Sequence, residues 1–256
     1  MPFKKRQARR PRRKTMPKKR MTKKTSLVKT IKRVIHQQIE NKQWYNYAAN
    51  QSIQTCSGAA VPFLYSLLPT LSQSALDNGR IGNQVTVVKN NFTYCVNLLP
   101  YNAITNPSPL IYLKMWVVSL KNKSQFEGTP LLSDFNNFFE VGNSSLNFQG
   151  NTLDTLFRVN NELFTVHATR VHTLGTSGST PASSTNIYGG SNNPQARGTI
   201  YLGKYAKQLK YNDAGTIVSN RSLWLVIQPV TQDGSTGTGY ISSEIHYNHE
   251  VSYEDA

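Results

Sequence analysis

The chain has 256 residues, a formal net charge of +16 and a charged fraction of only 16%. No apolar run approaches the roughly 20 residues of a membrane helix, so we expect no membrane insertion. The N-terminus lacks the apolar segment of a secretory signal, and Cys56 and Cys95 form neither a CxxC pair nor a disulfide framework. We therefore expect a reducing intracellular environment, without a metal or a cofactor.

The positive charge is concentrated at the N-terminus. Residues 1–33 contain 16 of the 29 Lys and Arg residues, and the first acidic residue is Glu40. From residue 34 onward, 13 basic residues (29 minus 16) balance 13 acidic ones, so the body is formally neutral. A block of like charges with few apolar groups cannot offset its ordering entropy, so we expect residues 1–25 to be disordered when alone.

The basic arm is suited to phosphate groups. Neutralising phosphates releases condensed counterions, so the sequence predicts salt-sensitive and largely sequence-independent binding of nucleic acid. A nuclear-import signal is compatible with this role. Binding to an anionic membrane is less favoured, because it requires an apolar face that the arm lacks. The candidate nucleic-acid-binding residues are the cations Lys4, Lys5, Arg6, Arg9, Arg10, Arg12, Arg13, Lys14, Lys18, Lys19, Arg20, Lys23, Lys24, Lys29, Lys32 and Arg33.

Residues 26–43 predict one short basic helix. Its N-cap is Ser26, and its apolar residues recur with the spacing of one helical face: Leu27, Val28, Ile31, Val34, Ile35 and Ile39. Lys29, Lys32 and Arg33 turn at least partly away from that stripe. Such a helix either covers the sheet as a surface element, or associates with symmetry mates or nucleic acid after assembly.

An aromatic segment follows the predicted helix. Trp44, Tyr45 and Tyr47 could stack on unpaired bases, although aromatic side chains here more often pack beneath a sheet. Residues 51–78 contain Pro and Gly between short apolar pieces, which predicts an irregular edge strand and loops.

The remaining chain predicts short strands separated by turns. Residues 110–120 are nearly all apolar, which indicates a strand buried on both faces. Residues 130–139 predict a short helix or a packed loop, and the uncharged stretch 175–196 predicts a long loop. The predicted strands are 84–99, 110–120, 153–159, 163–174, 198–211, 222–230 and 240–253.

Strand alternation within residues 163–174 places Phe164, Val166, Ala168, Arg170 and His172 on one face. The strands show no βαβ rhythm. We therefore predict an all-β fold, a single eight-stranded antiparallel jelly roll spanning residues 44–256.

Catalytic motifs are not recognisable. His246, His249 and Glu250 suggest a metal site, but positions three apart on a strand point to opposite faces, so the two imidazoles would not converge. The chain has no GxSxG nucleophile turn, no phosphate-binding loop motif and no GxGxxG dinucleotide motif. We expect that the protein is not an enzyme.

Several segments resemble, in chain order, the small single-jelly-roll capsid proteins typified by satellite tobacco necrosis virus, a fold also found in capsids of many small circular single-stranded DNA viruses. The basic arm, the helical segment 31–35 and its closing residues 40–42 are similar. Residues 79–85 resemble the approach to the family's first barrel strand. Further similar segments are 115–118, 164–173 and 251–256.

The resemblance implies that 60 copies close a T=1 icosahedral shell with the arm inside on a packaged genome. Such a shell would turn about 960 positive charges (60 × 16) inward, suited to a genome of roughly one to two thousand nucleotides. Chain length and the long loop look more like those of the circular-DNA group, so the resemblance favours single-stranded DNA over RNA. The implied location is the virion, with the host nucleus and cytoplasm during assembly. No residue indicates a receptor.

An alternative is a cellular nucleic-acid-binding protein, such as a ribosomal or chromatin-associated β-domain with a basic extension. Ribosomal proteins usually carry positive charge on the folded body as well. The neutral body of this chain disfavours the alternative.

Overall fold

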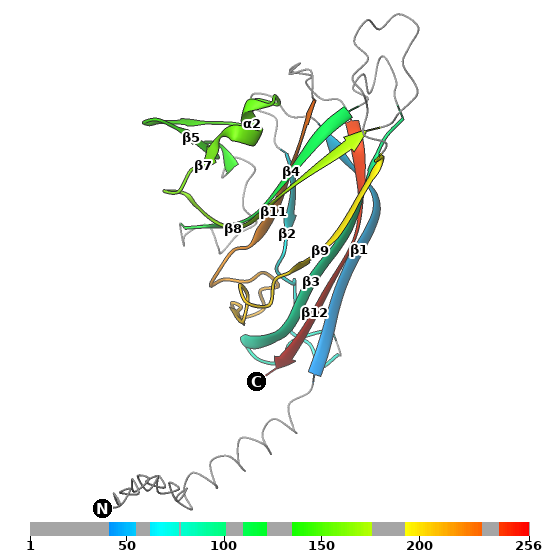
Figure 1. Cartoon of the computed structure of the whole chain (residues 1–256). Coiled ribbons are helices and arrows are strands. Elements are labelled where there is room, and N and C mark those ends of the chain that lie inside the picture. The colour runs from blue at the N-terminus through cyan, green and yellow to red at the C-terminus, as the bar shows by residue number, and fades with distance from the viewer. Residues whose placement is uncertain are drawn as a thin grey trace, which may run out of the picture. The chain divides into compact units, whose positions relative to one another are not determined.

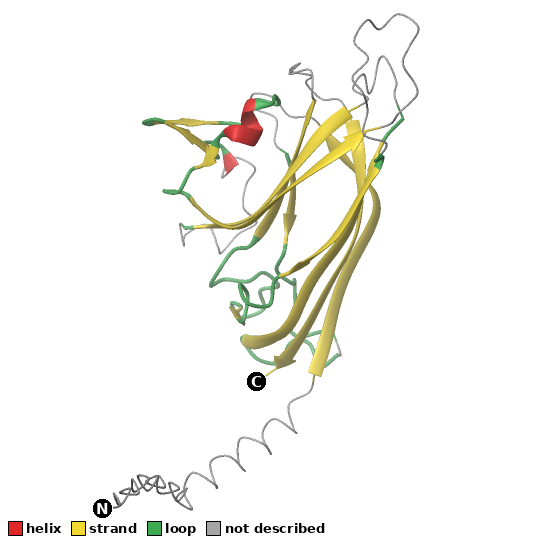
Figure 2. Cartoon of the chain, in the orientation of Figure 1, coloured by secondary structure: helices red, strands yellow, loops and turns green. Residues whose placement is uncertain are grey.

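The structure is a computed structural model, and it describes residues 41–54, 62–76, 78–100, 110–121, 135–175, 193–231 and 241–255. All of them belong to one compact unit, Glu40–Ala256. Strands make up almost all of its regular structure (Figures 1 and 2). In chain order the elements are β1 (Asn41–Gln54), β2 (Phe63–Ser66), β3 (Gln84–Leu98), β4 (Leu110–Leu120), β5 (Phe139–Val141), β6 (Ser144–Leu146), α2 (Leu153–Leu156), β7 (Arg158–Val159), β8 (Phe164–Gly175), β9 (Gln195–Tyr201), β10 (Gln208–Lys210), β11 (Trp224–Thr231) and β12 (Ile241–Asp255).

Two antiparallel sheets form the centre of the unit. In the first sheet the strand order is β1-β12-β3-β9, and the short β10 also pairs with β3. In the second sheet the order is β2-β11-β4-β8. Strands β1 to β4 alternate between the two sheets, and each sheet pairs a strand from the N-terminal half with one near the C-terminus, β1 with β12 and β2 with β11. This connectivity is an antiparallel jelly roll of one five-stranded and one four-stranded sheet, which confirms the predicted fold class.

The main hydrophobic core lies between the two sheets. Phe92 and Val96 of β3 and Ile245 of β12 pack from the first sheet, and Leu113 and Met115 of β4 from the second. Along each strand the side chains alternate between this core and the opposite face of the sheet, because successive side chains point to opposite sides.

A second cluster covers the outer side of β4. Trp116 packs edge-on against Phe138 and Phe139, with ring centroids 5.4 and 5.8 Å apart. These phenylalanines belong to a subdomain made of the small sheet β6-β5-β7 and α2. The prediction that β4 is buried on both faces is therefore confirmed. Of residues 130–139, predicted as a short helix or a packed loop, the structure describes 135–139, where Phe135, Phe138 and Phe139 are buried and Phe139 begins β5. The other sheet keeps one face free of this subdomain.

The N-terminal boundaries differ from the prediction. Strand β1 begins at Asn41, so residues 41–43, predicted as the end of a helix over 26–43, lie in a strand, while residues 26–40 lie outside the described part. The first barrel strand is β1, and residues 79–85 lead into β3 instead. The residue pattern did not predict strand β1, because its outward face is polar and its inward face contains few aliphatic residues.

Two predicted strands are also corrected. Residues 153–159 form the turn of helix α2 followed by β7, because the buried Asp154 carboxylate accepts backbone N–H bonds from Gln149 and Gly150 at 2.8–3.0 Å. Residues 198–211 divide into β9 and β10, which pair with different parts of β3. Most of the predicted long loop, residues 176–192, lies outside the described residues.

A β-bulge changes the predicted facing of β8. The pairing of β4 with β8 shifts at residue 167, where Val117 pairs with Ala168 but Val118 pairs with Val166. An extra residue on one strand moves the following side chains to the opposite face. Phe164 therefore packs in the outer cluster and Ala168 against the inner core, although the sequence predicted one shared face.

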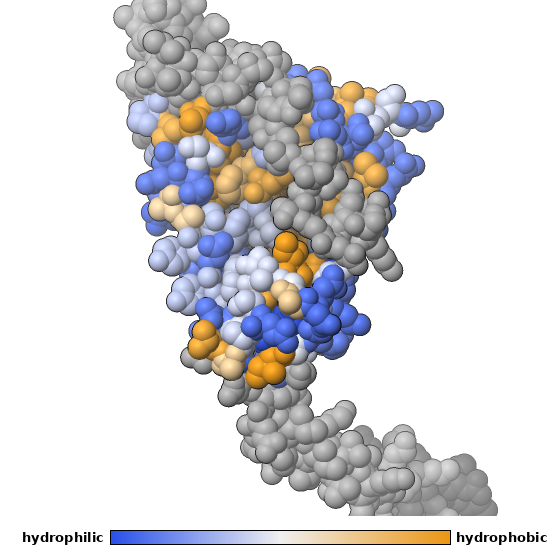
Figure 3. Space-filling view, turned by 180° about the vertical axis from the view of Figure 1, so that it is seen from behind, coloured by the Kyte–Doolittle hydropathy of each residue, from blue (hydrophilic) through white to orange (hydrophobic). Residues whose placement is uncertain are grey.

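The surface of the unit carries apolar residues in separate patches. Seen from behind, hydrophobic and hydrophilic residues are interspersed (Figure 3). The exposed apolar side chains include Leu153 and Leu156 of α2 and Val171 of β8. Within the described part of the chain, no helix is long and apolar enough to cross a membrane.

Candidate nucleic-acid interface

The sixteen predicted nucleic-acid-binding cations all lie in residues 1–33, outside the described residues. The described chain begins at Asn41, the first residue of β1. Because β1 is an edge strand of the sheet β1-β12-β3-β9, the basic segment is joined by its covalent chain to that sheet. The face of this sheet turned away from the core is therefore the candidate interface in the folded body.

We call this surface the β1 face. Strand register brings its residues into rows that cross the sheet: Tyr45 lies opposite Glu250, Glu250 opposite Asn91, and Asn91 opposite Tyr201. The next row contains Tyr47, Asn248, Thr93 and Thr199. The β1 face comprises Gln43, Tyr45, Tyr47, Lys89, Asn91, Thr93, Arg197, Thr199, Tyr201, His246, Asn248 and Glu250.

Three tyrosines stand out on the β1 face. The exposed fractions of Tyr45, Tyr47 and Tyr201 are 67%, 72% and 70%. Exposed aromatic rings are platforms on which unpaired bases stack without regard to sequence, each contact contributing about 1–3 kcal/mol. Sequence reasoning named Tyr45 and Tyr47 but not Tyr201, whose outward position follows only from the alternation of β9.

Trp44, the third aromatic residue of the predicted stacking segment, points the other way. Its ring is half-buried and meets the imidazole of His249 edge-on, with ring centroids 5.1 Å apart. Trp44 therefore packs beneath the sheet, whereas its neighbour Tyr45 remains available on the β1 face.

The charged groups of the β1 face are loosely held. Lys89 Nζ lies 3.4 Å from Glu250 Oε2, and both side chains are about half exposed, so water screens the pair and it contributes little to stability. Arg197 is exposed and donates from Nε to Gln195 Oε1 at 2.7 Å. Such side chains can turn toward phosphate groups at small cost.

A buried ion pair fixes the start of β1. Lys42 Nζ lies 3.4 Å from Asp255 Oδ2 and 3.3 Å from the Gly79 carbonyl, and the two side chains are only 3% and 4% exposed. Asp255 also accepts the backbone N–H groups of Ile81 and Gly82. The point at which the basic segment joins the body is thus tied to the last strand and to the loop before β3.

His246 and His249 lie on opposite faces of β12, as the strand spacing predicts. His246 lies on the β1 face, with Nε2 3.0 Å from Asn97 Nδ2 of β3, whereas His249 is fully buried. Among the described residues, no group of three or more His, Cys, Asp or Glu side chains is placed to hold a metal ion.

His249 joins the two sheets. Its Nε2 lies 2.9 Å from Asn90 Oδ1 of β3, and its Nδ1 lies 3.1 Å from the Tyr65 hydroxyl of β2. Asn90 in turn donates to the Leu67 carbonyl at 3.0 Å. Burial lowers the pKa of His249 to about 3, so the imidazole stays neutral in the folded protein.

This burial predicts a loss of stability in acid. An unfolded-chain histidine has a pKa of about 6.5, so below that pH the unfolded state binds a proton that the folded state excludes. The contribution of the neutral His249 side chain to the free energy of unfolding is complete above pH 6.5 and is lost as the pH falls toward 3. From pH 6.5 to 4.5 we expect His249 to lower the free energy of unfolding by about 2–3 kcal/mol.

Urea unfolding followed by tryptophan fluorescence at several pH values tests this. The His249→Gln variant should be less stable than the natural protein at pH 7 but should lose less stability between pH 6.5 and 4.5. His167 and His172, whose pKa values burial also lowers, remain in both proteins, so their effects cancel in the difference. If the free energy of unfolding fell equally between pH 6.5 and 4.5 in the natural protein and in His249→Gln, the prediction would be contradicted.

No protein-family model matches the sequence, and no curated protein matches it significantly. Among solved structures, the chain is similar to one titled unassembled KI polyomavirus VP1 pentamer. The two share 10% sequence identity with a TM-score of 0.27, over 84% of this chain and 95% of that chain. The jelly-roll assignment therefore rests on the strand pairings themselves.

Proposed function

We propose that the protein is a viral capsid subunit that self-assembles into a small icosahedral shell and packages single-stranded nucleic acid through its basic N-terminal segment. The observation that carries the proposal is the separation of charge from fold. Sixteen cations precede residue 34, and the chain beyond it, which forms the jelly roll, has equal numbers of basic and acidic residues.

The jelly roll hosts several unrelated functions, so the fold alone does not decide among them. A neutral body distinguishes a shell-forming subunit, since copies without net charge meet without strong mutual repulsion. The exposed apolar side chains of α2 and β8 offer surfaces for such contacts. The cationic segment then supplies attraction for a polyanion independently of the contacts between copies.

A shell of 60 copies with T=1 symmetry is the arrangement that the sequence resemblance favours. Its 60 × 16 cations would neutralise on the order of a thousand phosphates, which matches a short single-stranded genome. We propose DNA as that genome, the virion as the location of the assembled protein, and the host nucleus and cytoplasm as the places of assembly.

Electron microscopy of the expressed full chain, with nucleic acid measured by ultraviolet absorbance, tests the proposal. We expect round particles of uniform size that contain nucleic acid. Affinity for single-stranded oligonucleotides should fall steeply with salt and vary little with sequence. A protein that stays monomeric at every salt concentration, with and without nucleic acid, would exclude a capsid role, and a defined 1:1 complex with one folded RNA would favour a cellular binding protein.

A further inference from the structure

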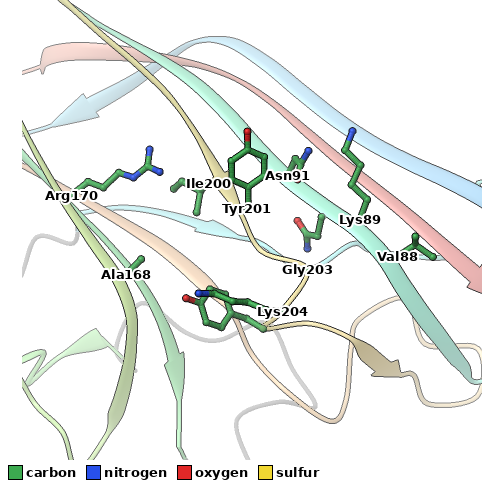
Figure 4. Close-up of a pocket in the computed structure, with 11 residues that line it drawn as sticks. Val88, Lys89, Asn91, Ala168, Arg170, Ile200, Tyr201, Gly203 and Lys204 are labelled. Carbon is green, nitrogen blue, oxygen red and sulfur yellow. The ribbon is translucent and has the colours of Figure 1, made fainter. Parts of the chain in front are cut away.

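A hollow of about 650 Å³ opens where the edges of the two sheets approach each other. Both β9 and β10 pair with β3, and residues 202–207 between them leave the edge of the first sheet interrupted. The hollow is lined by residues 88–91 of β3, by the end of β9 with residues 203–205, and by Ala168 and Arg170 of β8 (Figure 4).

Three cations and no acidic residue line the hollow. They are Lys89 of β3, Arg170 of β8 and Lys204, which follows β9. Lys204 is exposed, and its ammonium lies 4.6 Å from the centroid of the Tyr205 ring. Lys89 is also paired with Glu250 and points away from the other two, so Arg170 and Lys204 are the cations available to a ligand (Figure 4). Positive groups that line a concave surface attract anions, because the surrounding low-dielectric walls focus their field.

Arg170 is held in place beneath β9. Its Nη2 donates to the Thr199 carbonyl at 2.8 Å and its Nη1 to the Tyr94 hydroxyl at 3.2 Å. Gly198 makes room for it, since a Cβ at that position would lie 2.8 Å from Nη1. A guanidinium fixed by neutral partners keeps its full charge and has further N–H groups for an anionic ligand.

An exposed aromatic ring adjoins these cations. Tyr201, the last residue of β9, lines the hollow and is 70% exposed. Asn91, its cross-strand partner, lies beside it with an amide that can donate and accept hydrogen bonds. Cations beside an exposed ring meet the two chemical needs of a nucleotide, which are neutralisation of its phosphate and stacking of its base.

We propose that this hollow binds one nucleotide of a single-stranded nucleic acid, with the base on Tyr201 and the phosphate held by Arg170 and Lys204. The inference rests on the proposed function and adds to it a contact on the folded body. A single strand is required, because a base inside a duplex has no free face. Tyr45 lies across the sheet in the same row as Tyr201, about 14 Å away at three strand spacings, so one strand could contact both.

Photochemical cross-linking of the full chain tests the proposal. The probe is an oligothymidylate carrying 5-iododeoxyuridine, and cross-linked peptides are identified by mass spectrometry. We expect cross-links both in residues 1–33 and at Tyr201, with the Tyr201 cross-link absent from Tyr201→Leu while the N-terminal cross-links persist. The ratio of the two within one sample serves as an internal standard.

A matched pair of charge variants separates a specific site from general attraction. Lys204→Gln should lower the Tyr201 cross-link about tenfold relative to the N-terminal ones, as expected for loss of one charged hydrogen bond. Lys207→Gln removes the same charge three residues away, outside the hollow, and should leave the ratio unchanged.

The outcomes distinguish failure of the nucleotide site from failure of the proposed packaging function. N-terminal cross-links without one at Tyr201, or equal effects of the two lysine variants, would overturn the nucleotide site and leave the packaging function standing. Inorganic phosphate that suppresses the Tyr201 cross-link as well as thymidine monophosphate does would show an anion site without base stacking, and would also overturn it. No cross-link anywhere would contradict the proposed function itself.

Discussion

Replacing the thirteen Lys and Arg residues within residues 1–25 by Gln is expected to leave the jelly roll folded and to remove most of the nucleic-acid uptake. Each phosphate that the protein neutralises adds about 0.7 to the slope of log affinity against log salt for a single strand. Losing up to thirteen such contacts would flatten that slope by as much as about 9. Oligonucleotide binding over a range of salt concentrations, together with the absorbance of purified particles, measures both effects.

The matched control is a protein in which the order of residues 1–25 is shuffled. Shuffling keeps charge, length and composition but destroys any sequence motif, so uptake should remain close to that of the natural chain. Because the substituted residues precede β1, circular dichroism of both variants should show the same β-sheet signal. Undiminished nucleic-acid content in the Gln variant would refute the assignment of packaging to this segment.

Replacing Arg80 by Met is expected to destabilise the folded body by about 2–4 kcal/mol, because neutral acceptors lose their donor. Arg80 is fully buried, and its guanidinium joins two loops. Its Nη1 donates to the Gly82 carbonyl and Asn83 Oδ1 at 2.7 and 2.8 Å, and its Nη2 to the carbonyls of Asn212 and Gly215 at 2.9 and 2.8 Å.

The cost arises because removal of the guanidinium leaves four oxygens, all in part-buried hydrogen bonds, without this donor. Each unsatisfied buried acceptor costs about 1–3 kcal/mol before relaxation. The Arg80 guanidinium also lies 4.9 Å from the centroid of the Tyr211 ring, a contact that Met would not reproduce electrostatically.

Urea unfolding at neutral pH measures the effect of Arg80→Met. Arg80→Lys should also be destabilising, since a single ammonium has three donors and cannot reproduce a planar fork that spans two loops. Arg158→Met is the control, because Arg158 is exposed on β7, and it should change stability by no more than about 0.5 kcal/mol. Equal stabilities of the Arg80→Met and Arg158→Met variants would show that the buried guanidinium does not hold the two loops.

The fold class and most long strands were predictable from residue pattern. Strands β3, β4 and β8 lie within a residue or so of their predicted bounds, since alternating or continuous apolar runs bounded by turns leave little choice. Strand β1 was not predictable, because its inward positions include Lys42, whose burial depends on Asp255 from the other end of the chain, and the polar Asn46, which hydrogen-bonds to Tyr65. Local pattern contains no sign of such partners.

Only part of the candidate site could likewise be predicted from the sequence. Tyr45 and Tyr47 could be named as stacking residues from sequence, but whether Trp44 joined them depended on which face of β1 met the core. Lys89, Arg170, Tyr201 and Lys204 are spread over more than a hundred residues, and nothing in their local sequence links them. They meet because β9 pairs with β3 in the first sheet and Arg170, on the edge strand β8 of the second sheet, donates to the Thr199 carbonyl of β9.

The amino-acid sequence by itself determined the separation of a cationic segment from a neutral all-β body, because charge and hydrophobic periodicity are properties of neighbouring residues. The tertiary structure decided which face of each strand is buried, which oxygens the Arg80 guanidinium binds, which partners hold His249, and which cations line the hollow at Tyr201. Those features depend on the register between strands distant in sequence, and a shift of one residue would reverse every side chain involved.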